Sequence, residues 1–192
     1  MESETTSLGT FKIVILGDGE VGKTTFVERH ITSRFNNAYA PTLGVEVHPI
    51  LFHTNYGSIK FNVWDCAGVE EYRGIRDGYY ITANGAILMF DVTSEPSFTH
   101  LHRWALELMR VCEGIPTFIC GNKVDLEERV VSVNVEIPNL GVNEFGTQMG
   151  YCDLSVESNH NIEKPFLFLA RKLTGMEDLE FVDTPPSPTI DK

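Results

Sequence analysis

The amino-acid sequence predicts an α/β fold in which helices flank a mostly parallel sheet of six strands. Three short apolar runs, residues 13–16, 86–90 and 117–120, are typical of parallel strands that are buried on both faces. Stretches with helical spacing of apolar residues separate these runs. Strands that alternate with helices predict a doubly wound sheet, and ligands of such sheets bind at the carboxyl ends of the strands.

The other three strands are predicted from different patterns. Residues 45–53 and 59–64 alternate polar and apolar side chains around a turn near 55–58, so we expect a hairpin there. Residues 151–154 predict the last strand. Helices are expected after Lys23 and over two segments in which apolar residues recur every three or four positions, 98–109 and 162–173.

Length and composition indicate a single domain. The chain has 192 residues, and its net charge of −12 argues against a broad basic surface for nucleic acid. The four cysteines lack the spacing of a metal site, so we expect reduced thiols. No apolar stretch is long enough to span a membrane. We expect a monomer with a disordered N-terminal tail over 1–10, a domain over 11–175 and an extended, proline-rich C-terminal tail over 176–192.

Residues 17–24 fit the pattern of a loop that binds nucleotide phosphates: a glycine, four residues, then Gly22, Lys23 and Thr24. Glycines let the backbone turn sharply beside an anion, and the amides at the start of the following helix face it. Lys23 is expected to reach the β- and γ-phosphates and serve catalysis, and the Thr24 hydroxyl is expected to bind Mg²⁺. The residues expected to contact the nucleotide here are Asp18, Gly19, Glu20, Val21, Gly22, Lys23, Thr24 and Thr25.

Asn122, Lys123 and Asp125 follow another apolar run and indicate recognition of guanine. The Asp125 carboxylate can accept hydrogen bonds from guanine N1–H and the exocyclic amine, whereas adenine would leave it unpaired. Lys123 can lay its methylene stem along the loop, and Asn122 can tie two loops together. Together with the phosphate loop, these residues favour a guanine nucleotide over an adenine nucleotide.

Asp65, Gly68 and Thr42 complete the expected site. Asp65 ends a strand and can hold Mg²⁺ through a water, and Thr42 lies after the first helix as a second hydroxyl ligand. The Gly68 amide can meet a γ-phosphate because no Cβ stands in the way. A γ-phosphate bound to Thr42 and Gly68 would order two loops and release them on hydrolysis. We therefore expect Mg²⁺ at Thr24, Thr42 and Asp65, and Thr42 among the catalytic residues beside Lys23.

Beyond these motifs, the chain resembles the Ran family of small GTPases from about Phe11 to Val182. The resemblance is carried by residues 42–49, 52–55, 59–65, 76–80, 163–167 and 169–182. It implies a P-loop NTPase G domain that takes GTP or GDP with Mg²⁺. The partners it implies are importin- and exportin-type transport receptors, a chromatin-bound exchange factor and a cytoplasmic activating protein, in nucleus and cytoplasm. Residues 189–192 hold no prenylation cysteine, so no membrane partner is expected.

Position 69 is the largest departure from the family pattern. The family has a glutamine there that orients the attacking water, and this chain has Val69, whose side chain cannot hydrogen-bond. Hydrolysis of GTP is therefore expected to be impaired, with a weak response to an activating protein. Glu70 is an alternative for orienting the water, although it extends from a different backbone position.

Further departures affect the nucleotide and its partners. Ser155, Val156 and Glu157 stand beside the expected guanine site, where the Val156 amide can still meet guanine O6. Glu157 replaces a family cation whose stem covers the base, and Glu20 places a carboxylate in the phosphate loop. Residues 132–150 hold no Lys, Arg or His, although importin-type receptors bind a basic patch in this region of the family. The family's longer acidic C-terminal extension is also missing, which is expected to favour the GTP form.

Three functions remain open at this point. The first is a working Ran-type switch that binds transport receptors as GTP and releases them after hydrolysis. The second is a module that holds GTP, hardly hydrolyses it and competes for Ran partners. The third is a pseudo-GTPase scaffold in which Glu20 and Glu157 have ended nucleotide binding. Val69 distinguishes the first from the second, and Lys23 and Asp125 argue against the third.

Overall fold

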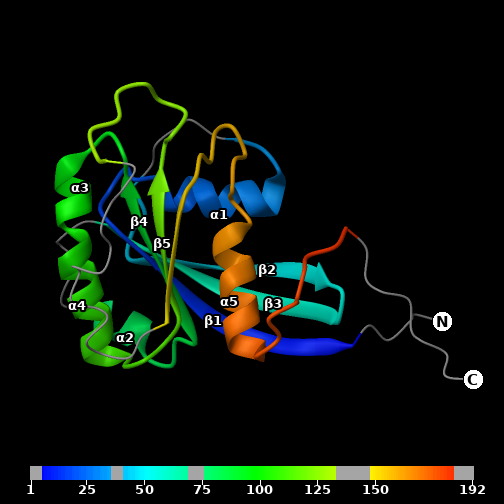
Figure 1. Ribbon diagram of the computed structural model, residues 1–192. Helices are drawn as coiled ribbons and strands as arrows, with labels where there is room; N and C mark the ends of the chain where they lie inside the picture. Colours follow the sequence, from blue (N-terminus) through cyan, green and yellow to red (C-terminus); the bar gives the residue numbers. More distant parts are fainter. Residues whose placement is uncertain (1–5, 36–40, 69–75, 133–147, 184–192) are drawn as a thin grey trace, which may run out of the picture.

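A six-stranded sheet with helices on both faces forms the domain (Figure 1). The computed structural model describes residues 6–35, 41–68, 76–132 and 148–183. The strands are β1 (Ser7–Leu16), β2 (Val45–Thr54), β3 (Gly57–Cys66), β4 (Gly85–Asp91), β5 (Thr117–Asn122) and β6 (Met149–Asp153). The helices are α1 (Lys23–Thr32), α2 (Arg76–Tyr80), α3 (Glu95–Thr99), α4 (Leu101–Val111) and α5 (Lys164–Thr174).

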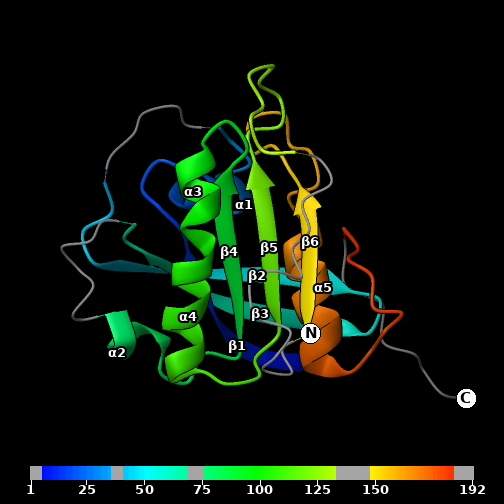
Figure 2. The same ribbon diagram turned by 60° about the vertical axis from the view of Figure 1, so that its left-hand side comes forward.

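The strand order is β2-β3-β1-β4-β5-β6, and only the β2–β3 hairpin is antiparallel. The predicted α/β fold and its mostly parallel six-stranded sheet are therefore confirmed. Parallel pairing brings the carboxyl ends of neighbouring strands to one edge, since Asp91 at the end of β4 is directly opposite Asn122 at the end of β5. The segments that follow β1, β4 and β5 consequently meet at this edge (Figure 2).

Two apolar layers hold the helices to the sheet. Helices α1 and α5 cover one face, where Phe26 and Phe166 stack with ring centres 5.5 Å apart. Helices α2 and α4 cover the other face, where Tyr80 and Trp104 are fully buried. The predicted helix over 98–109 is divided into α3 and α4 at His100, and the Ser94 hydroxyl caps α3 by accepting from the Ser97 amide.

The N-terminal prediction needs a correction. Strand β1 begins at Ser7, so residues 7–10 belong to the sheet and not to a disordered tail. They pair with the edge of β3 that faces away from β2, and the Ser58 amide donates to the Thr6 carbonyl at 2.8 Å. A backbone edge of this length binds another strand because its N–H and C=O groups need partners. Residues 1–5 lie outside the described residues.

The segment that follows α5 also differs from an extended tail. Residues 176–183 lie against the β2–β3 hairpin, and Leu179 is fully buried. Phe181 stacks on Phe52 with ring centres 4.3 Å apart, and Asn55 exchanges two hydrogen bonds with Glu180. This apolar contact extends the domain beyond the predicted limit at 175. The predicted tail over 184–192 lies outside the described residues.

Two smaller expectations concern composition. All four cysteines are free thiols, and Cys66 and Cys120 are buried. Within the described ranges, no helix is both long enough and apolar enough to cross a membrane.

Candidate nucleotide site

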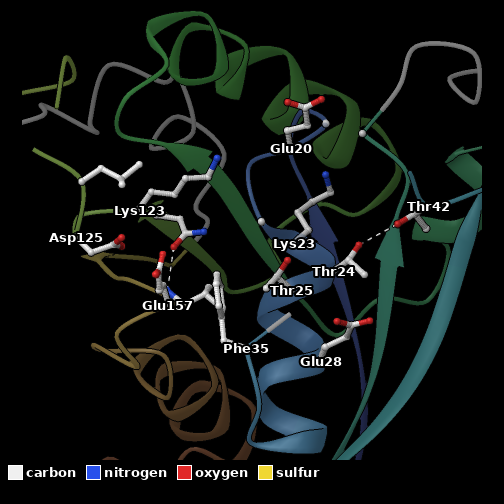
Figure 3. Close-up of a pocket in the computed structure, with 16 residues that line it drawn as sticks. Glu20, Lys23, Thr24, Thr25, Glu28, Phe35, Thr42, Lys123, Asp125 and Glu157 are labelled. Carbon is white, nitrogen blue, oxygen red and sulfur yellow. Dashed lines mark hydrogen bonds between the residues drawn. The ribbon is translucent and has the colours of Figure 1, made fainter. Parts of the chain in front are cut away.

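A cavity of about 630 Å³ opens at the carboxyl edge of the sheet (Figure 3). One wall comes from the phosphate loop and α1 and includes Gly19, Glu20, Gly22, Lys23, Thr24 and Thr25. The facing walls come from four other loops and include Thr42, Gly68, Asn122, Lys123, Asp125, Val156 and Glu157. The fold thus brings the two sequence motifs, about a hundred positions apart, to opposite sides of one space.

Glycines shape the phosphate loop. Gly17 has φ 148°, and a Cβ there would lie 2.1 Å from the Met89 carbonyl oxygen. Gly22 has φ 99°, and a Cβ there would lie 2.4 Å from Nδ2 of Asn122. A side chain at Gly17 would collide with β4, and a side chain at Gly22 would collide with Asn122. Helix α1 starts directly after Gly22, so its first backbone amides are left for a ligand in the cavity.

Lys23 is buried, with 6% of its surface exposed. Its ammonium donates to the carbonyl oxygens of Gly17 at 2.9 Å and Asp18 at 2.6 Å. These two hydrogen bonds fix the Lys23 ammonium against the loop that the sequence predicts to bind phosphates. A buried ammonium at a helix N-terminus attracts a phosphate strongly because little water screens it.

Thr24, Thr42 and Asp65 converge at the α1 end of the cavity. The Thr24 hydroxyl donates to Oδ2 of Asp65 at 2.6 Å and lies 2.9 Å from the Thr42 hydroxyl. Asp65 is fully buried, and its Oδ1 has no hydrogen-bond partner among the described residues. Burial raises the pKa of the Asp65 carboxyl, while the bond from Thr24 and the charge of Lys23 lower it.

These three residues fit Mg²⁺. A hydroxyl oxygen can bind a cation through a lone pair while its O–H donates a hydrogen bond to Asp65. The unpartnered Oδ1 of Asp65 leaves an acceptor for a water of the hydrated ion. A divalent charge would also offset the cost of burying this carboxylate. The predicted grouping of Thr24, Thr42 and Asp65 therefore has the chemistry that a magnesium site needs.

Gly68 lies directly on the phosphate loop. A Cβ at this position would be 2.4 Å from the Asp18 carbonyl carbon and the Gly19 nitrogen. The close approach places the backbone after β3 against the loop and beside the cavity. Because only glycine fits, the backbone of Gly68 itself is in contact with the phosphate loop.

Asn122 ties two loops together, as its place in the sequence predicted. Its Nδ2 donates to the Val21 carbonyl at 2.9 Å, and its Oδ1 accepts from the Val156 amide at 3.2 Å. Val21 and Ser155 therefore support the cavity from behind and do not line it. The Val156 amide, expected to meet guanine O6, is bonded to Asn122 and would have to share its proton with the base.

Asp125 is oriented by Ser155, whose hydroxyl donates to its Oδ1. Ser155 is fully buried and accepts from the Ser158 amide at 3.0 Å, so the donor is itself fixed. Within the described part of the chain, Oδ2 of Asp125 makes no hydrogen bond, and the side chain lines the cavity in Figure 3. The loop geometry thus presents a carboxylate to a ligand's donor edge.

The family comparison agrees with this geometry. A model of the Ras family matches residues 12–175. The chain belongs to the Ras family. Members of this family are GTP-binding switches, and they bind GTP or GDP together with Mg²⁺. The cavity of this Ras-family chain is accordingly the candidate nucleotide site, with the phosphate loop at one end and Asp125 at the other.

One ion pair and three lining residues of this Ras-family site were not predicted from the sequence. The Lys123 ammonium pairs with Asp91 at 2.6 Å, and its backbone has φ 68°. Asp91 also accepts from the amide and the hydroxyl of Thr93, which fix its position. The ion pair fixes the position of the Lys123 side chain. The sequence feature that could have indicated this pair is Asp91, a carboxylate at the end of the neighbouring strand. Glu28, Phe35 and Leu126 also line the cavity, without any sequence motif to indicate them.

Asp18 was predicted to contact the nucleotide, but its side chain faces α4. Its carboxylate is bonded to His100 at 2.6 Å and to the indole of Trp104 at 2.8 Å, and Arg103 lies 3.5 Å away. Asp18 does not line the cavity, so only its backbone is available to phosphates. The carboxylate turns outward because the Arg103 guanidinium and the indole N–H of Trp104 are on that side, whereas phosphates would repel it.

Acidic side chains outnumber basic ones in the described lining of the cavity. Lys23 and Lys123 face the carboxylates of Glu20, Glu28, Asp125 and Glu157. Glu20 adopts φ 64°, a left-handed conformation that costs energy for a residue with a Cβ. An anionic ligand in this lining depends on a divalent cation to balance the charge. Val69 and Glu70 lie outside the described residues, as do 133–147, so the predictions on hydrolysis and on the missing basic patch rest on sequence.

Proposed function

We propose that this chain is a Ran-type guanine-nucleotide switch in nucleocytoplasmic transport, which binds importin- and exportin-type receptors in its GTP form and hydrolyses GTP slowly. The observation that carries the nucleotide part is the single cavity shared by Lys23 and Asp125. Lys23 places a buried positive charge at the start of α1, and Asp125 presents a carboxylate that Ser155 holds in place. A guanine nucleoside with a phosphate chain matches both ends.

A contact between distant segments supports the Ran-type assignment. Residues 52–55 and 179–182 both belong to the stretches that resemble the Ran family, and they lie against one another in the structure. The Asn55 side chain bonds to the Glu180 amide at 2.9 Å, and the Val182 amide donates to the His53 carbonyl at 2.9 Å. The shared residues thus form one interface, as expected if the resemblance reflects a common structure.

Each residue of the site has a separate task in this proposal. Asp125 accepts hydrogen bonds from the base, and Lys23 with the amides of α1 binds the phosphates. Thr24 and Thr42 supply hydroxyl oxygens for Mg²⁺, and the ion supplies charge neutralisation at the β- and γ-phosphates. The Gly68 amide contacts the γ-phosphate, so GTP and GDP order the segment after β3 differently.

Slow hydrolysis follows from position 69. Val69 offers no hydrogen bond to the attacking water, and this orienting step contributes to catalysis in GTPases. An exchange factor bound to chromatin would load GTP, and a cytoplasmic activating protein would have little effect. The protein would then act as a monomer in nucleus and cytoplasm and spend most of its cycle in the GTP form.

A second candidate is a module that holds GTP and competes for Ran partners without cycling. Val69 favours it on the chemistry of hydrolysis. The acidic lining of the cavity favours the related pseudo-GTPase, because Glu20 and Glu157 weaken the attraction for phosphates. Lys23, Asp125 and the intact grouping around Asp65 argue for retained nucleotide binding.

The experiment loads the purified chain with GDP or with a non-hydrolysable GTP analogue and measures binding to an importin-type receptor. The proposal expects tight binding only with the GTP analogue, and slow release of phosphate in a single turnover of GTP. Equal binding in both forms, or none, would overturn the Ran-type role. A chain that releases neither guanine nucleotide on denaturation nor binds one by calorimetry would instead be the pseudo-GTPase.

A further inference from the structure

A second groove, of about 580 Å³, lies between α5 and the end of the sheet formed by β5 and β6. Its floor is largely aromatic and consists of Phe118, Tyr151 and Phe168, with Leu167 beside them. None of the residues that line the nucleotide cavity line this groove. It is a separate surface on the face covered by α5.

A glycine lies directly against the aromatic floor of the groove. A Cβ at Gly150 would lie 2.5 Å from two ring atoms of Phe118 and 3.1 Å from Phe168. The rings of Phe118 and Phe168 pack with centres 5.1 Å apart at 59°. Phe118 is nearly buried, whereas Phe168 is partly exposed. The floor is therefore a preformed aromatic surface that a ligand can contact without moving the core.

Three cations stand along the groove on one face of α5. Arg171 and Lys172 follow Lys164 by seven and eight residues, which is about two turns of helix. The Lys172 ammonium lies 5.8 Å from the Phe168 ring centre, and Nε of Arg171 donates to the Leu179 carbonyl at 2.8 Å. Lys164 also lowers the pKa of the Cys152 thiol on β6, against a larger rise from burial. Its charge is thus felt at the strand side of the groove.

The positive charge around the groove contrasts with the negative net charge of the whole chain. Net charge is −12, yet Glu177 is the single acidic residue in the described lining of the groove. Lys164 and Lys172 are exposed, and neither ammonium pairs with a carboxylate among the described residues. Positive charge that is concentrated around an aromatic floor complements an anionic partner with an apolar side chain.

We propose that this groove binds an extended acidic peptide segment of a partner protein, in which two carboxylates flank an apolar side chain. Lys164 and Lys172 are about 12 Å apart along the helix axis. An extended chain advances about 3.3 Å per residue, so carboxylates four residues apart span the same distance. The residue midway between them places its side chain over Phe168, and each carboxylate meets a lysine at one end.

The test uses a fluorescein-labelled peptide with the order Gly-Glu-Ser-Phe-Ser-Glu-Gly and the GDP-loaded full chain, with fluorescence anisotropy as the readout. Two control peptides replace both glutamates by lysine or the phenylalanine by alanine. Lys164→Glu and Lys172→Glu are the groove variants, because both side chains are exposed and their change should not disturb the fold. Lys60→Glu makes the same charge change at an exposed position on β3 and is the matched control.

The proposal expects saturable binding of the glutamate peptide, weakened about fivefold or more by either groove variant and unaffected by Lys60→Glu. Binding should also weaken as salt rises from about 50 to about 300 mM. Equal binding of the glutamate and lysine peptides would overturn the proposal, as would groove variants that bind like the unmodified chain. Unchanged nucleotide affinity in all variants confirms that they are folded, so loss of peptide binding reports on the groove.

Discussion

The indole N–H of Trp104 donates a hydrogen bond of 2.8 Å to Oδ1 of Asp18, and it joins the phosphate loop to α4. Trp104 is fully buried on the face that α4 covers. The other carboxylate oxygen of Asp18 is bonded to His100. The position of the phosphate loop therefore depends on a helix that contributes nothing to the lining of the nucleotide cavity.

Replacing Trp104 with phenylalanine tests this dependence. The change removes a hydrogen bond to a charged group, and we expect a loss of about 2 kcal/mol in the free energy of unfolding. We also expect faster nucleotide release, because the loop that binds the phosphates is less well fixed. Urea denaturation and release of a fluorescent GDP analogue measure the two effects. Leu106→Gln, at an exposed position of the same helix, is the control and should change stability by less than about 0.5 kcal/mol.

Base choice should depend on Asp125. Its carboxylate is fixed by Ser155 and can pair with the donor edge of guanine, so GDP should bind at least about a hundredfold more tightly than ADP. Asp125→Asn should shift the preference towards xanthine nucleotides, whose edge carries a carbonyl in place of the amine. Calorimetry with GDP, ADP and XDP checks this order. Equal affinity for GDP and ADP would contradict the assignment of the base site.

Nucleotide retention should depend on a divalent cation. Thr24 and Thr42 direct hydroxyl oxygens to one point beside Asp65, and the acidic lining needs a counter-charge. Adding a chelator should speed nucleotide release by about tenfold or more. Thr24→Asn should weaken GTP more than GDP, because the metal in the GTP form also uses Thr42 and the γ-phosphate. Release that is insensitive to chelator would show that the metal site is wrong.

Val69→Gln should restore hydrolysis. With glutamine to orient the water, turnover stimulated by a Ran-type activating protein should rise at least tenfold, which is about 1.4 kcal/mol of barrier. GTP affinity should stay nearly constant, since this side chain acts in the transition state. Single-turnover phosphate release with and without the activator is the measurement. Ordinary stimulated rates in the unmodified chain would mean that Glu70 or a partner side chain orients the water.

Stability should fall in mild acid because of His30. Its ring lies among Phe26, Phe52 and Phe166, and burial lowers its pKa while the Phe26 carbonyl opposes the shift. In the unfolded chain, histidine takes up a proton at pH about 6.5, so acid favours unfolding. The loss should begin as pH falls through that value and continue down to the lower pKa of the folded state.

His30→Phe is the variant that isolates this effect. It keeps an aromatic ring in the cluster and removes the proton-binding group. Thermal unfolding between pH 7.5 and 5.5 should show a smaller decrease in Tm for the variant than for the unmodified chain. If both proteins lose stability in parallel, another group is responsible for the acid sensitivity.

The sequence alone determined the parts of this protein that depend on local chemistry. Glycine spacing and the position of Lys23 predicted the phosphate loop, because few backbones can pass so close to an anion. Apolar runs and alternation predicted six strands, and the order of Asn122, Lys123 and Asp125 predicted the loop for the base. Each of these signals lies within a few residues, where spacing in the sequence and spacing in the structure are nearly the same.

The tertiary structure alone decided the contacts between segments that are far apart in the chain. Asp18 faces Trp104 and not the cavity, Lys123 pairs with Asp91, and residues 176–183 pack on the hairpin. These outcomes depend on which strands are neighbours and which helix covers each face, and no local pattern specifies either. A side chain turns to the partner that offers the best hydrogen bonds and the least exposed apolar surface, and that partner exists only once the fold has formed.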